Sequence, residues 1–79
     1  MNRESIILGL LAQACDDPRV LEEPDLDLYQ EDLLDSLAML QFFDGLESEL
    51  HLTLFPTQVS REELHTPRRV VETVLARLP

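Results

Sequence analysis

Apolar residues recur at helical spacing in three segments of the chain. The first follows Asn2, a favourable helix-capping residue, and stops around Asp16-Asp17-Pro18. The second begins at Asp35, and the last begins at Thr66-Pro67, where proline in the first turn costs no hydrogen bond. We therefore expect helices over residues 2–15, 36–50 and from 66 toward the end. The expected apolar positions of the first helix are Ile7, Leu8, Leu11 and Cys15, and those of the last helix are Val70, Val71, Val74, Leu75 and Leu78. In the second helix, the expected apolar side consists of Met39, Leu40, Phe42, Phe43, Leu46 and Leu50. Its expected polar side consists of Ala38, Gln41, Asp44, Gly45, Ser48 and Glu49.

The segments between these helices are less regular. Pro18 to Leu34 holds two prolines, many acids and spaced apolar residues, which predicts a long ordered loop that packs onto the helices. Leu52 to Val59 leans toward extended structure but contains a proline, so we expect a loop there. Ser60-Arg61-Glu62-Glu63 matches a capping box that opens a short third helix toward Leu64. At 79 residues the prediction is one all-α domain, a four-helix bundle with a short third helix and a long first loop.

Charge is concentrated in the middle of the chain. The formal net charge is −10, and residues 16–50 hold 12 of the 16 acidic residues with Arg19 as their single basic residue. Such a surface repels phosphate backbones and anionic lipid, and it steers basic proteins toward itself. We expect a protein partner, and neither nucleic acid nor a membrane.

The remaining composition favours a cytoplasmic protein, which we expect to be a monomer. Cys15 is the single cysteine, so no intramolecular disulfide can form, and its helical position indicates packing instead of a reactive thiol. The apolar run Ile6 to Ala12 is too short to span a bilayer. His51 and His65 fall at predicted helix ends, which explains them better than metal binding. For Arg68 and Arg69, which oppose the helix dipole, the candidates are pairing with Glu62 or Glu63 or contact with a partner.

Ser36 is the main candidate for chemistry. It lies in the first turn of the predicted second helix, where its hydroxyl can reach solvent and where the helix N-terminus favours an attached phosphate. A catalytic serine needs a base held by a third group, and the sequence contains no Gly-x-Ser-x-Gly elbow. From Asp35-Ser36 alone, a simple helix start is the better interpretation.

The surrounding residues change that balance. Leu33-Leu34-Asp35-Ser36-Leu37, followed by Leu40, Phe43, Leu46 and two acids, resembles the acyl carrier protein family. The whole chain is similar to the D-alanyl carrier proteins of that family, with Pro56, Arg61 and Thr66-Pro67 after the Leu-Leu-Asp-Ser block. Asp32 stands where the family usually has glycine. The resemblance implies that Ser36 carries 4′-phosphopantetheine, and that the chain is a carrier and not an enzyme.

The resemblance also implies partners and a mechanism. A phosphopantetheinyl transferase adds the arm from coenzyme A, an adenylating ligase loads D-alanine as a thioester, and a downstream acyltransferase passes it to a cell-wall acceptor of the teichoic-acid type. All bond chemistry then belongs to the arm and the partners. The expected docking residues are Asp35, Leu37, Gln41, Asp44, Glu47 and Ser48.

Three alternatives remain open from the sequence. The cargo can be another amino acid or an acyl chain, since selection lies in the ligase. The chain can be an unmodified acidic helical module that binds a basic partner. A small hydrolase using Ser36 is the weakest of the three.

Overall fold

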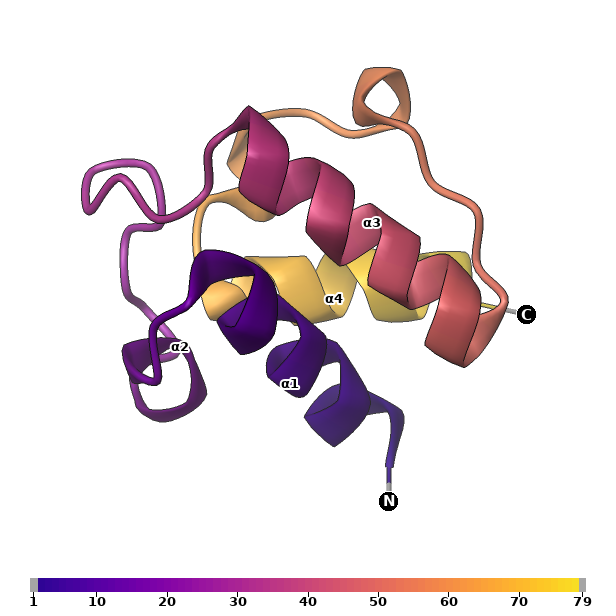
Figure 1. Ribbon diagram of the computed structural model, residues 1–79, viewed down its shortest axis with the longest axis horizontal. Coiled ribbons are helices and arrows are strands. Elements are labelled where there is room, and N and C mark those ends of the chain that lie inside the picture. Colours follow the sequence, from indigo (N-terminus) through magenta and orange to yellow (C-terminus); the bar gives the residue numbers. More distant parts are fainter. Residues whose placement is uncertain (1, 79) are drawn as a thin grey trace.

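Three long helices cross around one apolar core in the computed structural model, which describes residues 2–78 (Figure 1). They are α1 (Arg3–Cys15), α3 (Ser36–Leu50) and α4 (Pro67–Arg77). In Figure 1, α1 lies at the front, α3 crosses above it, and α4 runs behind both. The three helices predicted from the apolar spacing are confirmed.

The predicted capping residues begin these helices. The Asn2 side chain accepts a hydrogen bond from the Ser5 amide at 2.8 Å, and Thr66 Oγ1 accepts one from the Arg69 amide at 3.2 Å. Each oxygen accepts a hydrogen bond from a first-turn amide that has no partner within its helix. The boundaries of α1 and α4 therefore follow from local sequence.

The long first loop contains a helical turn that the sequence analysis missed. This turn, α2 (Arg19–Glu22), begins where Asp17 Oδ1 accepts a hydrogen bond from the Arg19 amide at 2.9 Å. Val20, a residue of this turn, is buried in the core. The expectation that the rest of the loop packs onto the helices is confirmed, because Leu28 is fully buried and its amide donates to the His65 carbonyl at 2.9 Å.

The short third helix is a single 3₁₀ turn, η2 (Glu62–Leu64), which completes the predicted bundle. Its capping box is confirmed: Ser60 and Glu63 exchange two hydrogen bonds, from the Ser60 amide to Glu63 Oε1 at 2.9 Å and from the Glu63 amide to Ser60 Oγ at 3.3 Å. A second 3₁₀ turn, η1 (Pro56–Gln58), lies in the segment predicted as loop.

The buried face of α3 is rotated from the face that periodicity predicts. Ala38 was expected on the polar side but is buried, and Leu40 was expected in the core but is 57% exposed. The cause is the close approach of α1: a Cβ built on Gly45 would lie 2.9 Å from Leu10 Cδ2. Because α1 covers the side of α3 that carries Ala38 and Gly45, Leu40 is left at the edge. The expectation for Leu75 on α4 is also wrong, since it is 40% exposed.

Ion pairs join the acidic loop to the C-terminal half. Arg68 Nε lies 3.1 Å from Asp25 Oδ1, and Arg69 Nη2 lies 3.0 Å from Glu62 Oε2. The predicted pairing is thus confirmed for Arg69, whereas Arg68 takes an acid of the first loop. The Glu62 pair lowers the pKa of that carboxyl, mainly through the hydrogen bond from Arg69. The pair of Arg68 and Asp25 ties the start of α4 to the first loop.

Candidate functional site

Ser36 is the first residue of α3, and its side chain lies on the surface. Asp35 precedes it in an extended conformation and caps the helix, its Oδ1 accepting a hydrogen bond from the Ala38 amide at 2.8 Å. The predicted helix start is confirmed. The cap holds Ser36 at the end of a helix that is itself anchored in the core.

The residues before Ser36 fix the direction from which the chain enters α3. The amides of Leu33 and Leu34 both donate to the Leu28 carbonyl, at 2.9 and 3.2 Å, and Leu34 is buried. Asp32 turns the chain with a φ of 58°, in the left-handed region that favours glycine. This conformation explains why a glycine suits that position, and why aspartate, which tolerates it, can replace it.

The surroundings of Ser36 fit an attached phosphodiester. Its hydroxyl takes part in none of the side-chain hydrogen bonds of residues 2–78, so no side chain there is placed to act as its base. The first amides of α3 point toward the same end of the helix, where the helix dipole favours negative charge. An exposed oxygen beside free amides can hold a phosphate group without displacing any existing contact.

The expected docking residues share the exposed surface of α3. The side chain of Leu37 is 64% exposed although it is large and apolar. At about 100° per residue, the members beyond it fall within one continuous stripe along the helix. The residues of this stripe, all of them exposed, are Leu37, Gln41, Asp44, Glu47 and Ser48, whereas Asp35, also exposed, lies just before the helix as its cap.

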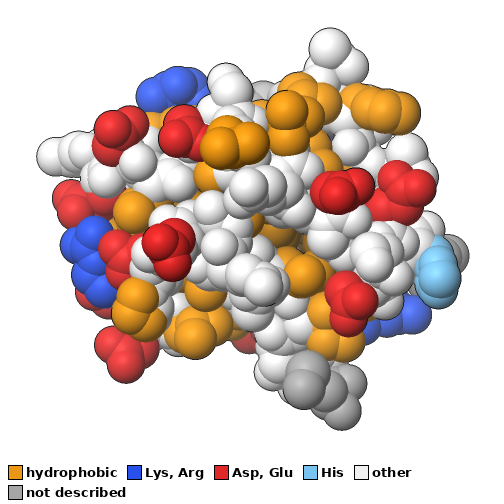
Figure 2. Space-filling view, viewed as in Figure 1, with side chains coloured by type: hydrophobic (Ala, Val, Ile, Leu, Met, Phe, Trp, Pro, Cys, Tyr) orange, Lys and Arg blue, Asp and Glu red, His pale blue; other side chains and the backbone are white. Residues whose placement is uncertain are grey.

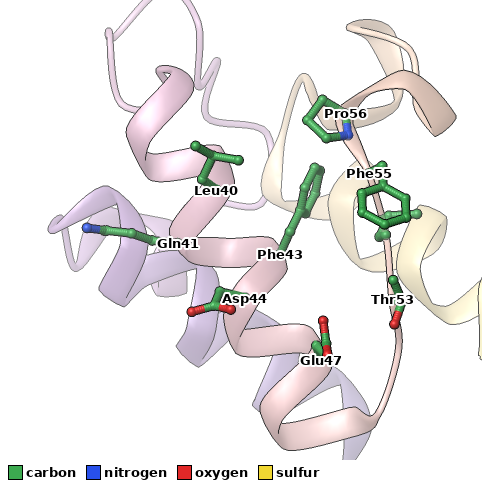
Figure 3. Close-up of a pocket in the computed structure, with 9 residues that line it drawn as sticks. Leu40, Gln41, Phe43, Asp44, Glu47, Thr53, Phe55 and Pro56 are labelled. Carbon is green, nitrogen blue, oxygen red and sulfur yellow. The ribbon is translucent and has the colours of Figure 1, made fainter.

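An apolar groove beside this stripe was missed in the sequence analysis. Leu40 and Phe43 of α3 face Phe55 and Pro56 across a groove of about 370 Å³, with Asp44 among the acids at its rim (Figure 3). Phe55 is 57% exposed. In Figure 2, hydrophobic side chains gather over the start of α3 and the loop that carries η1, with acidic side chains around them. The adjacent Phe55-Pro56 pair was a signal, but only the folded loop places it opposite α3.

Other titratable groups belong to the scaffold. Burial, with a smaller contribution from Asp35 and Asp17, raises the pKa of the Cys15 thiol to about 11, which confirms a packing role. His51 ends α3 in a left-handed conformation. His65 ends η2, so its predicted place at a helix end is confirmed; in addition, its Nε2 lies 2.8 Å from Asp27 Oδ2 and its ring stacks on Tyr29.

Two further observations concern metals and membranes. Within residues 2–78, no three His, Cys, Asp or Glu side chains lie together as a metal site requires. In the same range, no helix has both the length and the apolar character needed to cross a bilayer.

Several known proteins similar to this chain are named D-alanyl carrier proteins. The D-alanyl carrier protein of Abiotrophia defectiva is 39% identical over 75 residues, which cover 95% of each chain. That of Bacillus licheniformis is 32% identical over 66 residues, 84% of this chain and 85% of its own. That of Enterococcus faecalis is 30% identical over 76 residues, 96% of this chain and 97% of its own. No protein-family model matches the chain.

Identity at this level along nearly the full length of each relative extends well beyond the Leu-Leu-Asp-Ser block. It covers the long loop, the capped α3 and the Thr66-Pro67 start of α4 that position the exposed serine. The resemblance inferred from the sequence is confirmed, and so is the inference that the chain is a carrier and not a catalyst. This chain belongs to the D-alanyl carrier protein family.

Proposed function

We propose that Ser36 carries a 4′-phosphopantetheine arm on which D-alanine is held as a thioester. The observation that carries this proposal is the exposed Ser36 hydroxyl at the capped N-terminus of α3, in a chain that belongs to a family of D-alanyl carriers. Another aminoacyl or acyl cargo remains the alternative, because the ligase selects it.

The chain's own residues attach and present the arm. Ser36 Oγ forms the ester bond to phosphorus, and the 3′,5′-adenosine bisphosphate portion of coenzyme A leaves. The amides at the start of α3 stabilise the phosphodiester charge. Asp35 holds the helix start through its bond to the Ala38 amide. The arm, when attached, supplies the thiol that takes the aminoacyl group.

The proposed partners all meet the exposed surface of α3. A phosphopantetheinyl transferase recognises the negative charge of Asp35 beside Ser36. An adenylating D-alanine ligase and a downstream acyltransferase contact the exposed apolar side chain of Leu37. The polar side chains farther along this surface set the orientation of docking; they are Gln41, Asp44, Glu47 and Ser48. The final acceptor is a cell-wall polymer of the teichoic-acid type. We place the protein in the cytoplasm, where coenzyme A and the ligase are available, and we expect it to be a monomer.

Intact mass tests attachment directly. The purified chain is incubated with coenzyme A and a broad-specificity phosphopantetheinyl transferase. We expect the mass of one phosphopantetheine to be added to the native chain and to Ser5→Ala, a variant of another exposed serine. We expect no addition to Ser36→Ala, with its helical circular dichroism unchanged. A native chain that stays unmodified contradicts the carrier proposal.

Cargo is tested separately with the adenylating ligase that loads the modified protein. D-alanine, L-alanine and a fatty acid are offered in parallel, and the mass of the product is measured. We expect D-alanine to be loaded in preference to the other two. Loading of a different substrate contradicts the D-alanine assignment and leaves the carrier assignment standing.

A further inference from the structure

The groove between α3 and the Phe55-Pro56 segment lies directly along the helix from Ser36. At about 100° per residue, Ser36, Leu40, Phe43 and Glu47 fall within about 60° of one another, one above the next on the same face. Leu40 and Phe43 form the α3 wall of the groove, and Phe55 and Pro56 form the opposite wall (Figure 3). The groove is therefore an apolar path that begins one turn from Ser36.

Two carboxylates border this path: Glu47 lies at its far end on the same face as Phe43, and Asp44 lies near the level of Phe43 but farther around the helix. Asp44 and Glu47 border the groove and are exposed. The ion pairs of residues 2–78 use other acids, so both carboxylates are available for an external cation. An aminoacyl thioester ends in an ammonium group, whereas a simple acyl thioester ends in hydrocarbon. The groove is thus apolar near Ser36 and negatively charged where the end of an attached chain would lie.

The length of the arm matches the distance along α3 from Ser36 to these two carboxylates. At 1.5 Å of rise per residue, Asp44 lies about 12 Å and Glu47 about 16 Å along α3 from Ser36. From the serine oxygen to its sulfur, an extended phosphopantetheine has about the length of five extended residues, or roughly 16–18 Å. The aminoacyl ammonium lies a few bonds farther out, so a slightly bent arm brings it to these carboxylates.

We propose that the groove lined by Leu40, Phe43, Phe55 and Pro56 is the resting site of the charged arm, with Asp44 and Glu47 receiving the ammonium of the aminoacyl group. This inference rests on the proposed function, because the occupant is tethered at Ser36. Exposed ion pairs are weak, and each carboxylate should favour the docked arm by about two- to five-fold. Docking is therefore reversible, and a partner can withdraw the arm.

The test compares amide chemical shifts of the ¹⁵N-labelled protein in four forms: unmodified, carrying the free arm, carrying an acetylated arm, and carrying a D-alanylated arm. The last two are made with the transferase from acetyl-coenzyme A and D-alanyl-coenzyme A. We expect shifts at Leu40, Phe43 and Phe55 in all three modified forms. We expect additional shifts at Asp44 and Glu47 with the D-alanyl arm alone, and we expect high salt to reduce them.

Variants separate the charge from the apolar walls. Asp44→Asn combined with Glu47→Gln should remove the D-alanyl-specific shifts, and Glu49→Gln should keep them, because Glu49 is exposed on the other side of α3. Phe55→Ala should reduce the shifts in every modified form. The substituted side chains are exposed, and thermal denaturation checks that each variant folds.

The outcomes distinguish this inference from the proposed function. If the mass of the arm is added but shifts stay within a turn of Ser36, the arm extends into solvent and the groove is not its resting site. Equal shifts for the acetyl and D-alanyl arms overturn the role of the two carboxylates. Absence of any mass gain contradicts the carrier function itself.

Discussion

At the scale of single residues, the start of α3 divides two tasks between the neighbours Asp35 and Ser36. Asp35 is a structural cap, bonded to the Ala38 amide at 2.8 Å, and it is also a negative charge next to the proposed attachment oxygen. Ser36 has no structural bond of its own among the side-chain contacts of residues 2–78, so it can be modified without loss of packing. Stability and attachment are thus carried by different side chains.

Substitution of Asp35 separates its two roles. Asp35→Asn keeps an oxygen that can accept the Ala38 amide, so stability should change by only a few tenths of a kcal/mol, whereas Asp35→Ala should cost about 1 kcal/mol. Both variants lose the charge, and both should be modified more slowly by the transferase. Thermal denaturation and the initial rate of mass gain measure the two effects. Modification of Asp35→Asn at the native rate would show that the transferase does not read the charge.

At the scale of the helix, α3 is bounded by one favourable end and one strained end. Asp35 begins it in a relaxed extended conformation, but His51 ends it with a φ of 55°, where a side chain is unfavourable and glycine is preferred. The turn that ends the helix is held by the His51 amide, which bonds to the Glu47 carbonyl at 3.0 Å, and by the Leu52 amide, which bonds back to the Leu46 carbonyl at 3.4 Å.

Glycine at the end of α3 should therefore stabilise the protein. We expect His51→Gly to raise the free energy of unfolding by several tenths to about 1 kcal/mol. The matched control, Glu49→Gly, places the same residue in the helix interior and should lower it by roughly 0.5–1 kcal/mol. Urea denaturation of both variants gives the signs. Destabilisation by His51→Gly would mean that the His51 side chain makes a stabilising contact that outweighs the backbone strain.

At the scale of the whole molecule, the first loop is part of the core. Leu28 is fully buried in the core although it lies in no helix, and its amide ties the loop to the residue before Thr66. Arg61 adds a contact to the same region, its guanidinium carbon lying 3.9 Å above the Tyr29 ring. The loop thereby fixes the entry of the chain into α3.

Truncation of Leu28 should act as a core mutation. We expect Leu28→Ala to lower the free energy of unfolding by about 2–4 kcal/mol through lost burial and a residual cavity. Leu21→Ala, a leucine 55% exposed in α2, should change it by less than about 0.5 kcal/mol. Chemical denaturation measures both. Similar values for the two variants would contradict the assignment of the loop to the core.

Acid should weaken the link between η2 and α4. Because Arg69 lowers the folded pKa of Glu62 below the usual 4.5, the pair stabilises the fold above about pH 5 and loses that effect as pH falls through the folded pKa. Arg69→Gln should therefore lower the melting temperature at about pH 7, and this difference from the native protein should shrink as the pH falls through the folded pKa of Glu62. Arg3→Gln, which removes the same charge from an exposed site in α1, should show no such convergence with the native protein. A difference for Arg69→Gln that persists in acid would exclude the ion pair as its cause.

Local sequence determined much of this protein. Asn2, Asp35 and Thr66 start their helices because each side chain satisfies an amide of the next turn, an interaction that needs no distant partner. The same locality made Ser36 recognisable, since the Leu-Leu-Asp-Ser block and its helix start lie within a few residues.

Tertiary structure decided which side of each helix is covered and what lies across from it. Periodicity placed Leu40 in the core and Ala38 outside, but α1 approaches through Gly45 and reverses both. The groove of Phe43 and Phe55, the pairing of Arg68 with Asp25 and the bond of His65 to Asp27 each join residues far apart in the chain. Such contacts depend on how the helices pack. The spacing of apolar residues shows only roughly which side of a helix is buried, and it does not show which other segment packs against that side.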